Sequence, residues 1–101
     1  MKYGLSDKTL GTFDSIFRKY PGIKQCILYG SRAKGNYRNG SDIDLSLKTG
    51  DNFDFTNLLH IIGDFDDSDL PYFVDVSIYD NISNPDLKNH IDRVGKVLYD
   101  Y

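Results

Sequence analysis

The sequence has 101 residues, with 12 Lys and Arg against 15 acidic residues, all of them Asp, and a formal net charge of −3. This length corresponds to about one domain and argues against a multi-domain enzyme, so we expect residues 1–101 to form a single domain whose ligand site is shallow or completed by a partner. The apolar share of 40% and the charged share of 27% are typical of a globular domain and not of a disordered chain. The acidic balance argues against a protein that coats nucleic acid through a basic surface.

Neither a membrane span nor a secretory signal is predicted. No apolar run approaches the roughly 18 residues of a membrane-spanning helix, and residues 1–7 lack the apolar core of a signal peptide. We therefore expect a cytoplasmic protein. The single cysteine, Cys26, lies in an apolar run, so we expect it in the core and expect neither a disulfide framework nor a thiolate metal cluster.

The first half of the chain predicts one helix and two strands. Apolar residues recur at helical spacing over residues 6–20, and Pro21-Gly22 follows as a stop. Residues 24–29 form a short apolar run, which predicts a strand buried on both faces. Residues 42–48 alternate between polar and apolar, which predicts a strand with one buried face.

The second half predicts a helix, a strand and a last helix. Helical spacing runs over residues 51–63, with Gly63 as the expected C-cap, and residues 73–79 alternate as a strand does. Pro85 suits the first turn of a helix whose apolar stripe extends to Leu98. This order of elements predicts a small α/β sheet with helices packed on one face, while the other face, with the polar sides of two strands, stays more open.

The informative segment is Gly30-Ser31, followed by ten residues and then by Asp42 and Asp44. A glycine lets the backbone approach a phosphate closely, and a serine hydroxyl and the N–H groups of the following turn can donate to phosphate oxygens. Asp42 and Asp44 share one face of the predicted strand, so their carboxylates converge as a divalent cation with oxygen ligands requires. If the strand at 73–79 is a neighbour, Asp75 completes a trio that can hold Mg²⁺ ions at a triphosphate.

The spacing of Gly30-Ser31 and Asp42-x-Asp44 resembles the GSx₁₀DxD signature of the DNA polymerase β-like nucleotidyltransferase superfamily. The fuller run Gly-Ser-Arg-Ala-Lys-Gly, followed by Ser-Asp-Ile-Asp-Leu, is similar to its minimal nucleotidyltransferase (MNT) branch. The resemblance implies an α+β fold with a short mixed sheet backed by helices. It also implies Mg²⁺-dependent transfer of a nucleoside monophosphate, with ATP as the expected substrate and AMP as the group transferred to a hydroxyl.

The resemblance also assigns site residues. It implies that Asp42 and Asp44 hold metal, with two Mg²⁺ ions expected, and that Asp75 holds metal and acts as the base toward the acceptor hydroxyl. We expect nucleotide binding by four residues: Gly30, Ser31, Arg32 and Lys34. Lys34 stands where Arg is more common in the branch. Two plainer interpretations remain open, a capping role for Ser31 and a solvated loop for the basic residues.

Members of the MNT branch are commonly paired with a helical HEPN-type protein as antitoxin to toxin, and some transfer AMP to a tyrosine of that partner. We therefore predict a nucleotidyltransferase antitoxin with such a partner, and leave open whether it forms a homo-oligomer. One alternative is a catalytically weak module that neutralises the partner by contact. Another is adenylylation of a small molecule, for which an extra substrate domain is usual. The intact carboxylate trio favours the enzyme.

Two further features predict no site of their own. The acidic run over residues 64–69 begins like a calcium loop but lacks Gly at its sixth position and Glu at its twelfth, so a solvated turn is favoured. His60 and His90 have no partners at ligand spacing, and we expect structural or surface roles for both.

Overall fold

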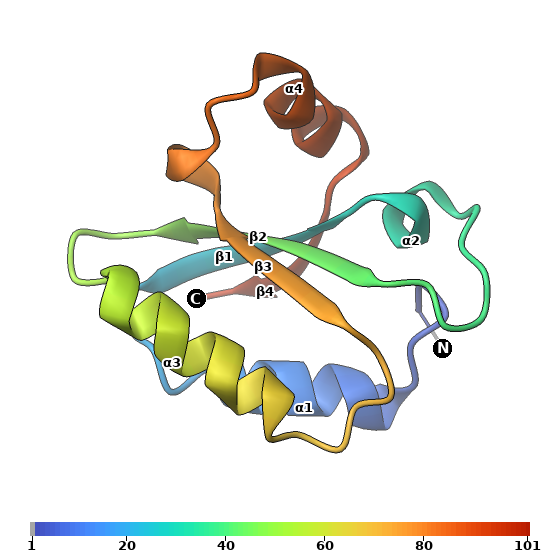
Figure 1. The fold of residues 1–101 in the computed structure, drawn as a ribbon, viewed down its shortest axis with the longest axis horizontal. Coiled ribbons are helices and arrows are strands. Elements are labelled where there is room, and N and C mark those ends of the chain that lie inside the picture. Colours follow the sequence, from blue (N-terminus) through green and yellow to red (C-terminus); the bar gives the residue numbers. More distant parts are fainter. Residues whose placement is uncertain (1) are drawn as a thin grey trace.

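The computed structural model describes residues 2–101. Its elements are α1 (Asp7–Phe17), β1 (Ile23–Tyr29), α2 (Ser31–Lys34), β2 (Ile43–Thr49), α3 (Phe55–Asp66), β3 (Val74–Ile78), the short 3₁₀ helix η1 (Tyr79–Asn81), α4 (Pro85–Val94) and β4 (Lys96–Asp100). The strands form one mixed sheet in the order β3-β2-β1-β4 (Figure 1). Strand β1 is antiparallel to β2 and β4, whereas β2 and β3 are parallel. The predicted α+β class with a short mixed sheet is confirmed.

Helices cover both faces of this sheet (Figure 1). Helices α1 and α3 lie on one face, where the rings of Phe13 and Phe17 pack edge-on against Phe65 with centroid separations of 5.4 and 5.9 Å. Helix α4 lies on the other face, where Ile91 packs with Ile27 and Tyr29 of β1. The expectation of helices on one face therefore holds for α1 and α3 but not for α4.

The predicted end of the helix at 51–63 is wrong. Helix α3 begins at Phe55, after Asp54 as a capping-box N-cap, and it continues through Gly63 to Asp66. The extension has a physical reason, because Phe65 continues the apolar stripe of the helix into the core. Residues 64–66 are consequently helical, which excludes the calcium-loop alternative, and Asp64 instead accepts a hydrogen bond from Tyr20 Oη at 2.5 Å.

The last predicted helix is also shorter than expected. Helix α4 ends at Val94, the backbone turns extended at Gly95, and Leu98 lies in β4, a strand that the sequence analysis missed. Strand β4 pairs with the edge of β1 that β2 leaves open. Leu98 lies four positions after Val94, a spacing that fits one face of a helix and also one face of a strand. The apolar pattern alone therefore could not distinguish a longer helix from a helix followed by a strand.

Cys26 is fully buried, as expected, and burial raises the pKa of its thiol. No helix in the described part of the chain is long and apolar enough to span a membrane.

Candidate functional site

The turn between β1 and α2 requires glycine. Gly30 is the N-cap of α2 and has φ +77° and ψ −156°, a conformation that residues with a side chain rarely adopt. A Cβ atom at this position would also collide with the Asp44 carboxylate. The Gly30 turn and the Asp44 carboxylate are therefore packed directly against each other. The sequence motif gave only their separation along the chain and not this contact.

The sheet places Asp44 in a row with two other residues. Asp44 of β2 is the register partner of Tyr29 in antiparallel β1 and of Asp75 in parallel β3. Neighbouring strands lie about 4.8 Å apart, so in-register residues project side by side on one face. Asp42 precedes β2 by one residue and shares this side by alternation. The condition set by the sequence analysis, that the strand of Asp75 neighbours that of Asp42 and Asp44, is met.

Electrostatics show that the three carboxylates interact. Burial raises the pKa of Asp44, and the charges of Asp75 and Asp42 raise it further, whereas His90 lowers it. Burial also raises the pKa of the Tyr29 phenol, and the charges of Asp44 and Asp75 raise it again. Negative charge is therefore concentrated around Asp44, and the opposing effect of His90 on its pKa is smaller than that of the neighbouring carboxylates.

These residues fit a divalent cation with oxygen ligands. Within residues 2–101, no three His, Cys, Asp or Glu side chains are already gathered as a metal-binding group. Asp42 and Asp75 are exposed, however, so their side chains have room to turn toward Asp44, which is half-buried. Carboxylates are ligands that Mg²⁺ prefers, and a cation would relieve the repulsion that raises the pKa of Asp44.

His90 of α4 supports the glycine turn. The backbone N–H of Gly30 donates to His90 Nε2 at 3.2 Å, and the imidazole packs edge-on against Tyr29 with centroids 6.1 Å apart. The expected structural role of His90 thus lies at the site itself. The N–H groups of residues 31–33 start a helix, so in the described chain they have no intrahelical partner and remain available to an anion.

Arg32 is placed differently from the prediction. Its side chain is buried, with only 2% exposure, and its guanidinium donates to the backbone oxygens of Ser41 and Tyr3. Its guanidinium carbon also lies 5.3 and 4.7 Å from the ring centroids of Tyr37 and Tyr72. The solvated-loop alternative is therefore wrong for Arg32, whose guanidinium is engaged by protein atoms.

Ser31 and Lys34 both lie at the surface, so their assignment to nucleotide binding stays a prediction. Ser31 is half-buried at the first position of α2, and Lys34 is exposed at its end. The ion pairs among residues 2–101 are Arg18 with Asp14 and Lys19 with Asp64, so the Lys34 ammonium is not engaged by a carboxylate.

Comparison with known proteins identifies the family. The model of the family described as polymerase beta, nucleotidyltransferase, matches residues 12–101. The chain belongs to the polymerase β nucleotidyltransferase family. No curated protein sequence matches this nucleotidyltransferase.

Solved structures share its fold. A toxin–antitoxin structure with AMP-PNP is 22% identical, with a TM-score of 0.73 over 91% of this chain and 73% of that chain. The structure of MntA–HepT is 18% identical, with a TM-score of 0.69 over 95% and 74% of the two chains. A Shewanella oneidensis structure, a tri-AMPylated HEPN toxin in complex with MNT antitoxin, is 19% identical, with a TM-score of 0.67 over 91% and 70%. The fold is that of MNT antitoxins.

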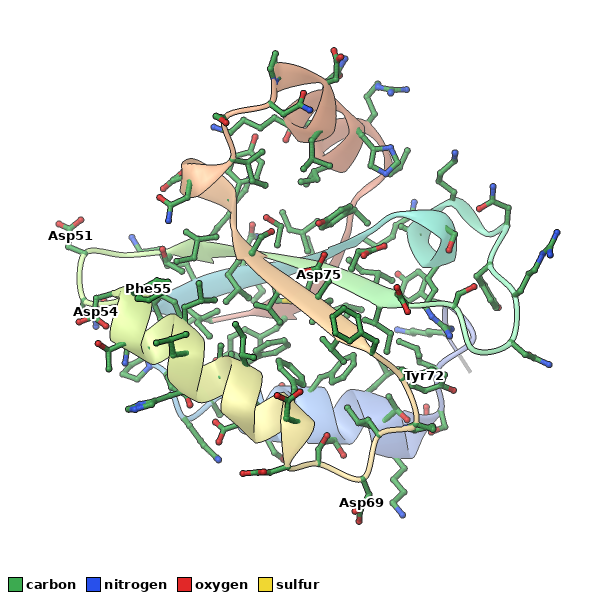
Figure 2. All side chains as sticks on the ribbon, in the orientation of Figure 1. Asp51, Asp54, Phe55, Asp69, Tyr72 and Asp75 are labelled. Carbon is green, nitrogen blue, oxygen red and sulfur yellow. The ribbon has the colours of Figure 1, made fainter. Side chains whose placement is uncertain are left out.

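Tyr29 and Tyr72 were not singled out as site residues by the sequence, and His90 was expected only in a structural or surface role. Tyr29 ends β1 directly before the motif, so the adjacent glycine was a signal that could have drawn attention to it. His90 and Tyr72 lie far along the chain, and only the packing of α4 and of the segment before β3 brings them to the turn and to Arg32. Figure 2 shows Tyr72 at the start of the segment that leads to Asp75.

Proposed function

We propose that this nucleotidyltransferase transfers AMP from ATP to a tyrosine hydroxyl of a HEPN-type toxin and thereby acts as its antitoxin. One observation carries the proposal: Asp44 lies directly against the Gly30 turn and in register with Asp75 on the neighbouring strand. The family supports nucleotidyl transfer. The fold shared with a toxin–antitoxin structure with AMP-PNP and with a complex of a tri-AMPylated HEPN toxin supports the nucleotide and the partner.

Each residue has a defined part in the proposed reaction. Asp42, Asp44 and Asp75 would hold two Mg²⁺ ions, which supply positive charge to the triphosphate and to the leaving pyrophosphate. Ser31 and the free N–H groups at the start of α2 donate to phosphate oxygens, and the Lys34 ammonium adds a positive charge. In the transfer, the acceptor oxygen bonds to the α-phosphorus, the bond from that phosphorus to the pyrophosphate oxygen breaks, and Asp75 accepts the hydroxyl proton.

The position of Asp75 favours a protein as acceptor. Strand β3 is an edge strand of the sheet, and Asp75 on it is exposed. An acceptor hydroxyl can therefore reach the carboxylate from outside the domain. Because the base lies on an open surface, the acceptor must be held largely by contacts that its own carrier makes, which a folded protein partner provides.

The test is a transfer assay with labelled ATP. The purified chain, Mg²⁺ and the HEPN-type protein encoded in the same genome are incubated with ATP labelled at the α- or at the γ-phosphate. We expect the α-label alone to appear on the partner and mass spectrometry to locate it on a tyrosine. Transfer of the γ-label would indicate phosphorylation instead, and neutralisation of the partner without any label would favour the contact module.

A further inference from the structure

One buried side chain connects the segments that carry the proposed site. Arg32 lies in α2, directly after the Gly30 turn with its serine. Its Nε and Nη2 atoms donate to the Ser41 carbonyl at 3.2 and 2.9 Å, and Ser41 is followed by Asp42. Its guanidinium also stacks on Tyr72, which precedes β3 and therefore Asp75.

The backbone around Asp42 is held on both sides. Before it, the Ser41 carbonyl accepts the two hydrogen bonds from Arg32. After it, the N–H of Ile43 donates to the Phe73 carbonyl at 2.9 Å. Asp42 itself is exposed, so its carboxylate is placed by its backbone and not by packing of its side chain.

The loop that precedes Asp42 has few other restraints. Residues 36–40 are all exposed, and the loop is bounded by Gly35 and Gly40, both in positive φ conformations. A local turn joins Arg38 and Ser41 through hydrogen bonds of 2.8 and 3.0 Å, but this turn does not reach the sheet. The start of the loop is held to α2 by a hydrogen bond from the Asn36 N–H to the Ser31 carbonyl at 3.2 Å. At the other end of the loop, beside Asp42, the bonds from Arg32 to Ser41 tie it to α2.

Burial of Arg32 excludes a second use of its charge. Within residues 2–101, no carboxylate pairs with this guanidinium, and its charge is compensated by backbone carbonyls and by the faces of Tyr37 and Tyr72. The Nη1 atom is occupied by the Tyr3 carbonyl at 3.0 Å. A cation satisfied by carbonyls and aromatic faces on several sides is a structural connection, since replacing these partners with phosphate would leave them unsatisfied.

We propose that Arg32 is a positioning residue that holds the loop carrying Asp42 at a fixed distance from the Gly30-Ser31 turn, and that it does not bind the nucleotide. Its catalytic consequence rests on the proposed function, because a displaced Asp42 weakens metal binding and so transfer. The connection itself does not depend on that function. Lys cannot replace Arg here, because one ammonium group cannot reproduce the planar fork that reaches both Ser41 and Tyr3.

The experiment compares Arg32→Lys with two controls, using Mn²⁺ alone as the probe. Mn²⁺ affinity is measured by electron paramagnetic resonance, and amide hydrogen exchange is followed over residues 36–42. We expect Arg32→Lys to lower Mn²⁺ affinity by about 10-fold, the usual loss when a group supporting a metal ligand is removed, and to speed amide exchange in this loop.

The first control, Asn39→Ala, is an exposed change in the same loop and should alter neither the Mn²⁺ affinity nor the amide exchange. Phe65→Leu, a core change far from the loop, should lower the Tm without lowering Mn²⁺ affinity.

The outcomes separate the two roles of Arg32. Unchanged Mn²⁺ affinity and loop exchange in Arg32→Lys, with weakened ATP binding, would overturn the positioning role and assign the side chain to the nucleotide. If Arg32→Lys does not fold, Arg32→Met keeps a long side chain in the same space but removes every donor to Ser41 and Tyr3, and normal loop exchange and Mn²⁺ affinity in that variant would equally overturn it. Absence of AMP transfer by the unmodified protein would contradict the proposed function only, because neither readout uses ATP or an acceptor.

Discussion

Asp44 and Asp75 are register partners on the parallel strands β2 and β3, and the charge of Asp75 raises the pKa of Asp44. Two carboxylates placed side by side destabilise the sheet unless something favours their proximity. Asp42 adds a third charge that acts on Asp44. A bound cation would offset this repulsion, so the arrangement is understandable as a site that a cation completes.

Replacing Asp42 and Asp44 together by Asn should abolish AMP transfer and leave the fold intact. Asn keeps the size of each side chain but removes the charge that holds Mg²⁺. Because burial, and then the charges of Asp75 and Asp42, raise the pKa of Asp44, the metal-free variant should have a Tm equal to or above that of the unmodified protein. Thermal unfolding in a chelator and transfer with Mg²⁺ measure the two effects, and full transfer by the variant would contradict the metal assignment.

Gly30→Ala should weaken binding of Mg²⁺-ATP by about 10-fold or more, because the added methyl displaces the Asp44 carboxylate. Gly35→Ala is the matched control: Gly35 also has a positive φ, +90°, but a methyl group added there would meet no other atom within 4 Å. Gly35→Ala should lose about 1 kcal/mol of stability from left-handed backbone strain, and Gly30→Ala should lose more, because its φ and ψ lie outside the left-handed helical region and its methyl group meets Asp44. Titration with ATP separates them, and equal losses of affinity would indicate that strain, not the approach to Asp44, is responsible.

The sequence predicted the elements that local pattern specifies. The strict alternation of residues 42–48 and 73–79 placed β2 and β3 correctly, and therefore placed Asp44 and Asp75 on polar faces. The sequence prediction failed where tertiary packing determines which residues are exposed. Ser46 lies on the polar face of β2 but is fully buried, because that face is not open to solvent along its whole length.

The site was predictable to the same extent. The motif specified Gly30 and its spacing from Asp44, but nothing local could show that Arg32 turns inward to Ser41 while Lys34, two residues later, stays exposed. Helix α2 has four residues, and side chains two positions apart in a helix, such as those of Arg32 and Lys34, lie on different sides. Which of these sides is buried depends on the loop over residues 36–41 and on the segment before β3 that carries Tyr72.

His90→Phe should weaken ATP binding by about fivefold, the equivalent of one hydrogen bond worth about 1 kcal/mol. The N–H of Gly30 loses its acceptor in this variant, so the turn is no longer held to α4. His90→Gln offers an amide oxygen as acceptor and should restore most of the affinity. Equal weakening by both variants would show that the imidazole matters through its packing on Tyr29.

Tyr20→Phe should lower the free energy of unfolding at pH 8 by about 1 kcal/mol and leave transfer unchanged. Burial and the hydrogen bond to Asp64 raise the pKa of Tyr20 from 10.0 to about 12. A raised pKa in the folded state contributes stability that is present below pH 10 and is lost as the pH rises toward 12. Urea unfolding of both proteins at pH 8 and pH 11 should therefore show a smaller difference at pH 11. A difference that stays constant would contradict the role of the phenolic proton.

Asp75→Asn distinguishes the enzyme from a module that acts by contact. If Asp75 accepts the proton of the acceptor hydroxyl, the variant should transfer AMP about 10²- to 10⁴-fold more slowly. Asp80→Asn, also exposed and just after β3, is the control for loss of one surface charge and should transfer normally. Binding of the partner should persist in both variants, because one isosteric change leaves most of an interface in place.

If Asp75→Asn still binds the partner in a pull-down but no longer labels it with AMP, the result supports an enzyme whose acceptor is the partner. Undiminished neutralisation of the partner in cells by Asp75→Asn would mean that contact alone is sufficient.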